Sequence, residues 1–371
     1  MSTTPAPTTA ALSDDDLFDH AARLISRPKE GPANSFELHA PLELLARRIL
    51  LERVDPGRRE LARQRITWVA ETYAQSGKPV ADADDAPPSV PSPDELVASL
   101  AAAAHAPIYF SLLPRVSPRS GAAASLIRPL ARELGRYPDW RIEWVDAGPR
   151  RGSGDASALT RGLLDTPRLG APGSDFIYPI MHQVDSQGVA ADVIGPVLGP
   201  ETDLDAASRA IARVAAWSML QDDPAHAPYG WTHCLTLPQA AVGIAGTTRD
   251  PLRAIAVAAT HVVGFRAALS NSAVTDCYEP EPVAVHALEA LDAPPQIAAA
   301  AVHHAPPSEV ESIVTELATR AALHPDAHVA KYTLACFDAA ASDPAQRRLY
   351  LAAAAHLRAW WANHPDPARP A

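Results

Sequence analysis

The chain of 371 residues is poor in cysteine, glycine and lysine. Its three cysteines, Cys234, Cys277 and Cys336, are far apart and form no CxxC pair, which argues against a disulfide framework or a thiolate zinc site. It has 18 glycines, yet no GxGxxG follows a strand pattern and no GxxxxGK[ST] is present. A CxxCH haem motif is also lacking. These absences argue against a dinucleotide site, a phosphate loop and a flavin or haem enzyme.

Positive charge is also scarce. The formal net charge is −11 with a pI of about 5.7, so the long-range field repels nucleic acid and acidic membrane surfaces. The N-terminus has neither a basic start nor an apolar core, and the Ala-rich windows 293–303 and 350–357 are too short to span a bilayer. We therefore expect a cytoplasmic protein that binds neither nucleic acid nor membrane.

Helical periodicity dominates the rest of the sequence. Ser13, followed by three aspartates, predicts the start of a helix that runs to about Ser26. The pattern predicts an all-α fold in which residues 1–12 form a disordered tail and residues 13–366 a single large helical domain. Further helices are expected near 36–54, 57–75, 119–135 and 205–220, with one from about Pro93, two in 235–269 and four in 281–364.

Several stretches read as irregular. Residues 82–93 (DADDAPPSVPSP) are typical of a linker, and 106–118 is interrupted by proline. The segment RIEWVDAG at 141–148 suggests a short strand, and the Gly/Pro-rich stretch 147–174 suggests a loop.

The fourteen histidines are the main candidates for catalytic or metal-binding residues. A surface or capping role is expected for those at helix ends or in Pro-rich loops, namely His20, His105, His226, His303, His304, His324 and His364. Five others adjoin apolar helical sequence: His39, His182, His233, His261 and His328. A single buried histidine is usually a hydrogen-bonded core residue, so only the set suggests a site.

The arrangement Asp326-Ala-His328-Val-Ala-Lys331-Tyr332 is the strongest local signal. His328 and Lys331 are three residues apart, so a helix places both on one face. Lys331 is also the only one of three lysines inside a helical pattern. Burial there would lower the pKa of its amine, which could then act as a base, form a Schiff base or add CO2. Alternatively, Lys331 reaches solvent and pairs with Asp326.

The other histidines have suggestive neighbours. Trp231 precedes His233 before an apolar helix, and Glu43 lies one turn after His39, where it could orient the ring. Asp185 has the same relation to His182. His261 lies in a strongly apolar helix and is expected either to pack in the core or to hydrogen-bond a substrate.

Three segments carry a family resemblance. HVAKYTLACFDAAASDPAQRRLYLAAAAHL resembles the C-terminal signature of the questin-oxidase-like family, with its His-x-x-Lys helix. GWTHCLTLPQAA looks like that family's central Trp/Leu-His-x-x-Thr segment, and ANSFELHAPLELLA is similar to its N-terminal motif, altered here at 37–41. Together the three cover about residues 33–362, although the region 80–175 resembles nothing that can be aligned.

The resemblance implies an oxygenase of aromatic-polyketide biosynthesis that opens or cleaves an anthraquinone-type ring with O2. Part of the family holds non-haem iron with four histidines and a carboxylated lysine, which implies Fe(II) bound by an N-carboxylated Lys331. The implied histidine ligands are His39, His182, His233 and His328, with His261 in reserve for His182. His233 and Lys331 are the expected catalytic residues, and Trp231 and Tyr332 are expected to stack on or hydrogen-bond the substrate. NAD(P)H could serve as an external reductant in a Baeyer–Villiger-like reaction.

Alternatives remain open. Other relatives oxidise the substrate without a metal, which leaves a cofactor-independent oxygenase as the first alternative. A helical binding or scaffold protein would instead have scattered histidines and no large pocket. A hydrolytic metal enzyme is disfavoured because the HD and HExxH patterns are lacking. The Ala-rich helices could also bury a homodimer face.

Overall fold

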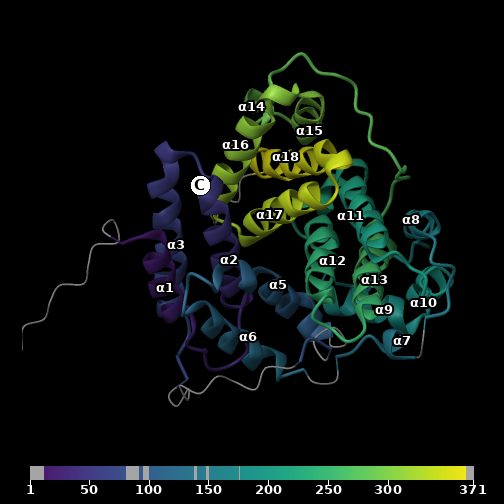
Figure 1. The fold of residues 1–371 in the computed structure, drawn as a ribbon, viewed down its shortest axis with the longest axis horizontal. Coiled ribbons are helices and arrows are strands. Elements are labelled where there is room, and N and C mark those ends of the chain that lie inside the picture. The colour runs from purple at the N-terminus through teal and green to yellow at the C-terminus, as the bar shows by residue number, and fades with distance from the viewer. Residues whose placement is uncertain are drawn as a thin grey trace, which may run out of the picture.

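The computed structural model describes residues 12–80, 92–94, 100–137, 140–147, 150–174 and 176–364. These residues form helices and no strand, which confirms the all-α prediction (Figure 1). The predicted disordered tail at 1–12, apart from Leu12, lies outside the described residues. The same holds for the predicted linker, apart from Ser92 and Pro93, and for most of the helix expected from Pro93.

The predicted N-terminal helices are present. Ser13 caps α1 (Asp14–Ile25) through a hydrogen bond from the Asp16 backbone, as expected from its sequence. Asn34 begins α2 (Ser35–Leu50) with a capping box completed by Glu37. The third helix, α3, spans Arg59–Gln75.

The middle of the chain is more helical than predicted. Residues expected to be irregular at 106–118 belong to α5 (Leu100–Val116), which accommodates Pro107 and Pro114 inside the helix. The expected strand at 141–148 is instead the single helical turn α7 (Glu143–Asp146). The expected loop at 147–174 contains α8 (Ala156–Leu164), which Asp155 caps.

Most of the remaining helices agree with the predicted pattern, including the break between α12 and α13 at GTTRDP. Their bounds are α6 (Ile127–Leu134), α9 (Ile177–Ser186), α10 (Val189–Ile194), α11 (Leu204–Gln221), α12 (Thr232–Ala245), α13 (Pro251–Leu269), α14 (Ala287–Ala290), α15 (Pro295–His304), α16 (Val310–Leu323), α17 (Ala327–Ser342) and α18 (Arg347–Asn363). The stretch 281–364 holds five helices rather than the predicted four, because the single turn α14 precedes α15.

Four helices from distant parts of the chain pack around a common centre. α2 packs against α5, α5 against α12, α12 against α17, and α17 against α2, so the four close into a ring. In Figure 1, α17 crosses the middle of the molecule, with α1, α2 and α3 on one side and α11, α12 and α13 on the other. Residues inside this ring are therefore surrounded by helix on all sides.

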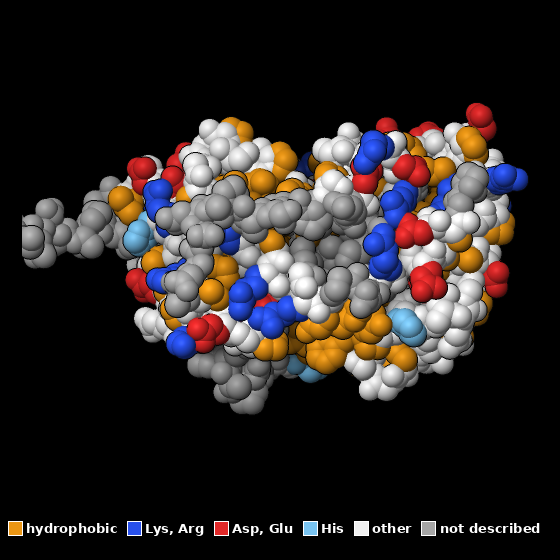
Figure 2. Space-filling model, turned by 90° about the horizontal axis from the view of Figure 1, so that it is seen from below, with side chains coloured by type: hydrophobic (Ala, Val, Ile, Leu, Met, Phe, Trp, Pro, Cys, Tyr) orange, Lys and Arg blue, Asp and Glu red, His pale blue; other side chains and the backbone are white. Residues whose placement is uncertain are grey.

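α13 is the one described helix that is long and apolar enough to cross a membrane, but 89% of its apolar window is buried within the protein. It is therefore a central core helix here. On the face shown in Figure 2, basic and acidic side chains are intermixed around a cluster of hydrophobic side chains.

Candidate metal and substrate site

One histidine from each helix of the ring reaches its centre. His39 comes from α2, His105 from α5, His233 from α12 and His328 from α17. The ring centroids of His39 and His105 are 5.1 Å apart, those of His39 and His328 4.7 Å, and those of His233 and His328 4.9 Å. Ligand atoms of His39, His233 and His328 lie within 4.8 Å of one another, which is the spacing that a single metal ion needs. We call these four residues the histidine cluster.

Three of these rings are anchored through one nitrogen. The Nδ1 of His39 contacts the Ser35 carbonyl oxygen at 2.6 Å, and the Nδ1 of His328 contacts Asp326 Oδ1 at 2.8 Å. The Tyr229 carbonyl oxygen accepts a hydrogen bond from the His233 ring. The Nε2 atoms of His39 and His328 are buried without a hydrogen-bond partner. An anchored Nδ1 with an unpartnered Nε2 is the usual arrangement of a metal-binding histidine.

Lys331 lies one turn beyond His328 and belongs to the same site. Its side chain is 4% exposed, and among the described residues no hydrogen bond or ion pair reaches its amine. Burial lowers the pKa of Lys331 to about 8, although the charges of Asp326 and Glu43 oppose this shift. At neutral pH a fraction of the amine is therefore uncharged and nucleophilic.

The histidines are held in the neutral form. Burial, reinforced by the charge of Lys331, lowers the pKa of His105 to about 3 and lowers those of His39, His233 and His328. His39, His105 and His233 nevertheless keep partly accessible side chains. Neutral imidazoles whose rings lie next to one another are suited to bind a metal ion.

A cavity of about 450 Å³ continues from this cluster along the same helix faces. Its lining includes Ile108, Thr236 and Lys331, each three residues after a histidine of the cluster on its own helix. Because residues three apart share a helix face, the cavity begins about one turn beyond the histidines, which do not themselves line it. The volume lies within the range typical of small-molecule sites.

Two residues that the sequence did not single out belong to the site. His105 was expected at the surface because its Pro-rich segment was read as irregular. Tyr229 packs edge-on against His328, with ring centroids 5.1 Å apart, and is 47% exposed. It lies in a short π-helix, Ala227–Trp231, and such segments frequently mark functional sites. His105 was missed because its helix contains prolines, and Tyr229 was missed because it lies in the π-helical turn before His233.

The prediction of His182 as a ligand of this site is wrong. His182 lies on α9 with an exposed side chain, outside the group of converging ring nitrogens. Asp185 does not orient it, because its carboxylate accepts the backbone N–H groups of Glu143 and Trp144 at the start of α7. The reserve ligand His261 is fully buried on α13, and burial alone lowers its pKa, with no contribution from Lys331. It packs in the core away from the cluster.

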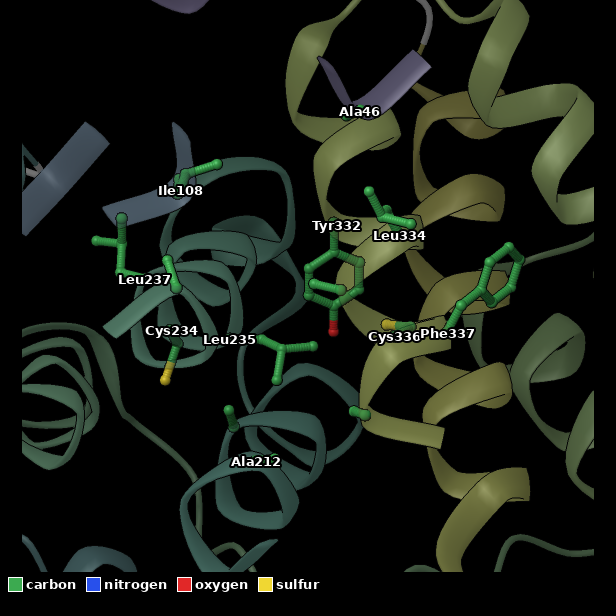
Figure 3. Close-up of a cluster of buried hydrophobic side chains, with 14 of the residues drawn as sticks. Ala46, Ile108, Ala212, Cys234, Leu235, Leu237, Tyr332, Leu334, Cys336 and Phe337 are labelled. Carbon is green, nitrogen blue, oxygen red and sulfur yellow. The ribbon is translucent and has the colours of Figure 1, made fainter. Parts of the chain in front are cut away.

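The two residues that were expected to contact the substrate, Trp231 and Tyr332, do not reach the cavity. Trp231 is completely buried and donates from Nε1 to the Asp223 carbonyl oxygen at 2.9 Å, so it closes the preceding turn. Tyr332 is completely buried, and its hydroxyl lies beside the thiol of Cys336. Figure 3 shows Tyr332 within the cluster of buried side chains that includes Leu235 and Leu334. Neither ring lines the cavity.

Glu43 does not orient His39 as expected. Its Oε1 instead binds buried Arg47 at 2.8 Å and 2.6 Å. Arg47 also donates to the carbonyl oxygens of Ala321, Ala322 and His324, at the end of α16. This pair joins α2 to the segment that leads into α17, so it positions two of the histidine-bearing helices relative to each other.

In comparisons with known proteins, no family model matches the chain, and no curated protein or solved structure matches it significantly.

Proposed function

We propose that this chain is a non-haem iron oxygenase that opens or cleaves a ring of an anthraquinone-type aromatic polyketide, as its resemblance to the questin-oxidase-like family implies. The observation that carries the proposal is the convergence of four histidines from four packed helices beside the unpartnered amine of Lys331. His105 takes the place that the sequence had assigned to His182.

The donor set fits iron. Imidazole nitrogen together with an oxygen donor suits Fe(II), and no thiolate lies in the cluster to favour zinc instead. Lys331 could provide the oxygen donor, because a neutral amine adds to CO2 and releases a proton to give a carbamate. A carbamate is negative, and Asp326 and Glu43 already place negative charge nearby. A metal cation would offset this repulsion, so metal and carbamate should stabilise each other.

When bound, the iron would supply the redox chemistry that lets O2 attack an aromatic substrate. The protein's own groups would do the rest. His39, His105, His233 and His328 would hold the metal, with Asp326 fixing the tautomer of His328. The largely apolar cavity would exclude water and orient the ring of the substrate beside Lys331. Insertion of a single oxygen atom would also consume an electron pair from an external reductant such as NAD(P)H.

A cofactor-independent oxygenase is the alternative on the same substrates. That mechanism needs a histidine able to deprotonate a phenol. The lowered pKa values of His39, His105, His233 and His328 make these rings weak bases, which favours a role as metal ligands.

Metal analysis tests the proposal. The purified protein should contain iron in stoichiometric amount, whereas His328→Ala and Lys331→Ala should lose most of it. His182→Ala is the matched control, since it removes an exposed histidine outside the cluster and should retain iron. Full iron loading with normal turnover in Lys331→Ala would refute the assignment of the site.

Oxygen consumption tests the reaction. With a panel of hydroxyanthraquinones, uptake of O2 should depend on iron and stop after treatment with a chelator. Turnover that persists in metal-free protein would refute the iron mechanism and support the cofactor-independent one. An iron-loaded protein that consumes no O2 with any aromatic substrate would point to a binding or hydrolytic function.

A further inference from the structure

The cavity beside Lys331 is elongated. Its lining on α17 runs from Lys331 through Asp338 to Ser342, which is about three turns or roughly 16 Å at the usual helical rise. The histidine cluster lies beyond one end of it, and Arg209 on α11 and Asp343 line its other part. A ligand that fills this cavity therefore has one end near the histidines and its other end near α11.

The walls between these ends are mostly apolar. The side chains that form them come from α5, α11 and α17, namely Ile108, Leu112, Ile211, Ala212, Leu334 and Ala335. Ser111, Ser208 and Thr236 also line the cavity, but each hydroxyl donates to a carbonyl oxygen of its own helix. The walls therefore favour a hydrophobic ring system over a sugar or a peptide.

Three polar side chains that line the cavity donate hydrogen bonds and have no partner within the described part of the chain. They are Lys331 at the inner end, Gln239 on α12 and Arg209 on α11. Two are cationic and the third carries an amide N–H2 group. Their combination favours a ligand with acceptor oxygens, because it would give buried Lys331 a hydrogen-bond partner and would replace water at the partly exposed Gln239 and Arg209.

The charge of Arg209 helps to lower the pKa of Asp343, but the two acids Asp338 and Asp343 form their ion pairs with other arginines. Arg213 binds Asp343 through two hydrogen bonds of 2.6 Å and 2.8 Å, and Arg115 binds Asp338 at 2.8 Å. Asp205 lies one turn before Arg209 but is exposed and forms no ion pair with it among the described residues. The guanidinium of Arg209 is thus a partly buried positive charge available to a ligand.

We propose that this cavity binds a flat, fused-ring aromatic that carries a carboxylate, with the carboxylate on Arg209, a ring oxygen on Gln239 and the opposite ring beside Lys331. A guanidinium binds a carboxylate through paired hydrogen bonds, which explains the preference for that group. Since the whole chain has a net charge of −11, selection of an anion must come from this local arginine. The identity of the reacting end rests on the proposed function, whereas the choice of an anionic ligand rests on the cavity alone.

Calorimetric titration with two matched probes tests this inference. Anthraquinone-2-carboxylate and the neutral anthraquinone-2-carboxamide differ only in charge at one end. The full-length protein should bind the carboxylate about tenfold more tightly, the difference expected for a charge-assisted hydrogen bond. Arg209→Gln should abolish this preference, with a much larger loss of affinity for the carboxylate than for the carboxamide, because the carboxamide carries no charge for the guanidinium to bind. Gln239→Ala should weaken both probes severalfold.

Control variants separate the cavity from general charge effects. Arg151→Gln removes an exposed arginine from a loop outside the cavity and should leave both affinities unchanged. Ala335→Trp should block the cavity and abolish binding of both probes. Arg209 is partly exposed, so Arg209→Gln should not disturb folding. This variant tests the inference even if Ala335→Trp does not fold.

The outcomes distinguish this inference from the proposed function. Equal affinity for the two probes, or an equal loss in Arg209→Gln and Arg151→Gln, would overturn the inference even in a protein that binds iron. Absence of iron together with the expected selectivity would overturn the proposed function and leave the anionic ligand in place.

Discussion

A single oxygen atom of Asp326 holds His328 at two points. Asp326 Oδ1 accepts the His328 backbone N–H at 2.7 Å and contacts the ring Nδ1 at 2.8 Å. The first contact caps the start of α17. The second places the proton on Nδ1, so Nε2 is unprotonated and its lone pair can bind a metal ion. Hydrogen bonds to His328 keep the pKa of Asp326 well below its usual range, so the carboxylate stays charged. The start of this helix and the tautomer of its histidine therefore depend on the same side chain.

Asp326→Asn should separate these two roles. The amide oxygen can still cap α17, but it loses the charge that makes the His328 ring a stronger ligand. We expect the melting temperature to change little and the affinity for iron to fall roughly 10–100-fold, the usual effect of losing such a partner.

The control is Asp203→Asn, because Asp203 caps α11 outside the site. It should leave iron binding unchanged in a competition titration with a chelator. If both variants bind iron as tightly as the parent protein, the proposed role of Asp326 is wrong. Asp326→Ala should lose the cap as well, at a further cost of about 1 kcal/mol.

Arg47→Met should destabilise the whole fold. The side chains of Arg47 and Glu43 are 1% and 2% exposed, and removal of one partner leaves the other charge buried. Such a change costs roughly 3–5 kcal/mol in the free energy of unfolding. The double variant Arg47→Met with Glu43→Leu should recover part of the loss, because neither charge of the buried pair remains and only the 3.6 Å contact of Arg65 with Glu43 is lost in addition.

Urea unfolding of the parent, Arg47→Met, Glu43→Leu and the double variant measures these changes in the free energy of unfolding. The exposed pair of Arg347 and Glu311 is a suitable comparison, and its removal should cost less than about 1 kcal/mol. A single variant with the stability of the parent would show that the buried pair does not hold α2 to the end of α16.

Two histidines outside the site should make the fold sensitive to acid. His261 and His356 are 0% and 2% exposed, and burial lowers their pKa values from 6.5 to about 3 and about 4. Below pH 6.5 these two histidines are protonated in the unfolded chain but remain neutral in the folded chain. The free energy of unfolding therefore falls as the pH decreases towards their folded-state pKa values. For His356 the loss between pH 7 and pH 5 should be about 2 kcal/mol.

His356→Leu should remove that share of the pH dependence while retaining the apolar packing of α18. Unfolding of the parent and variant at pH 7 and pH 5 provides the measurement, with the exposed His182→Leu as the control. An identical loss of stability in parent and His356→Leu would contradict the prediction.

Bicarbonate should strengthen iron binding if Lys331 forms a carbamate. In CO2-free buffer the apparent affinity for iron should be at least tenfold weaker than with bicarbonate, because binding would lack one ligand. Lys331→Arg retains a positive charge but cannot form the carbamate, so its affinity should not respond to bicarbonate. Carbon-13 NMR with labelled bicarbonate should give a carbamate signal in the parent protein and none in the variant. A parent protein insensitive to bicarbonate would leave iron bound by histidines alone.

Local signals predicted much of the fold. Ser13 begins a helix as expected, since capping depends on residues that are close in sequence. The proline rule failed in α5, because tertiary packing against α2 and α12 stabilises a helix that contains Pro107 and Pro114. That failure also removed His105 from consideration.

The site was harder to predict because its members are neighbours only in space. His182 and His39 have similar apolar surroundings in the sequence, but only the packing of α2 brings its histidine to Lys331. Tyr229 and Trp231 are two residues apart, and the π-helical turn determines that Tyr229 rather than Trp231 meets His328. Such a turn leaves no clear trace in a single sequence.

The order of the donor helices along the chain has a consequence for biosynthesis. His39 and His328 come from distant parts of the chain, so the four rings can meet only after α17 has been synthesised. A polypeptide that is cut between α2 and α17 therefore cannot assemble the histidine cluster.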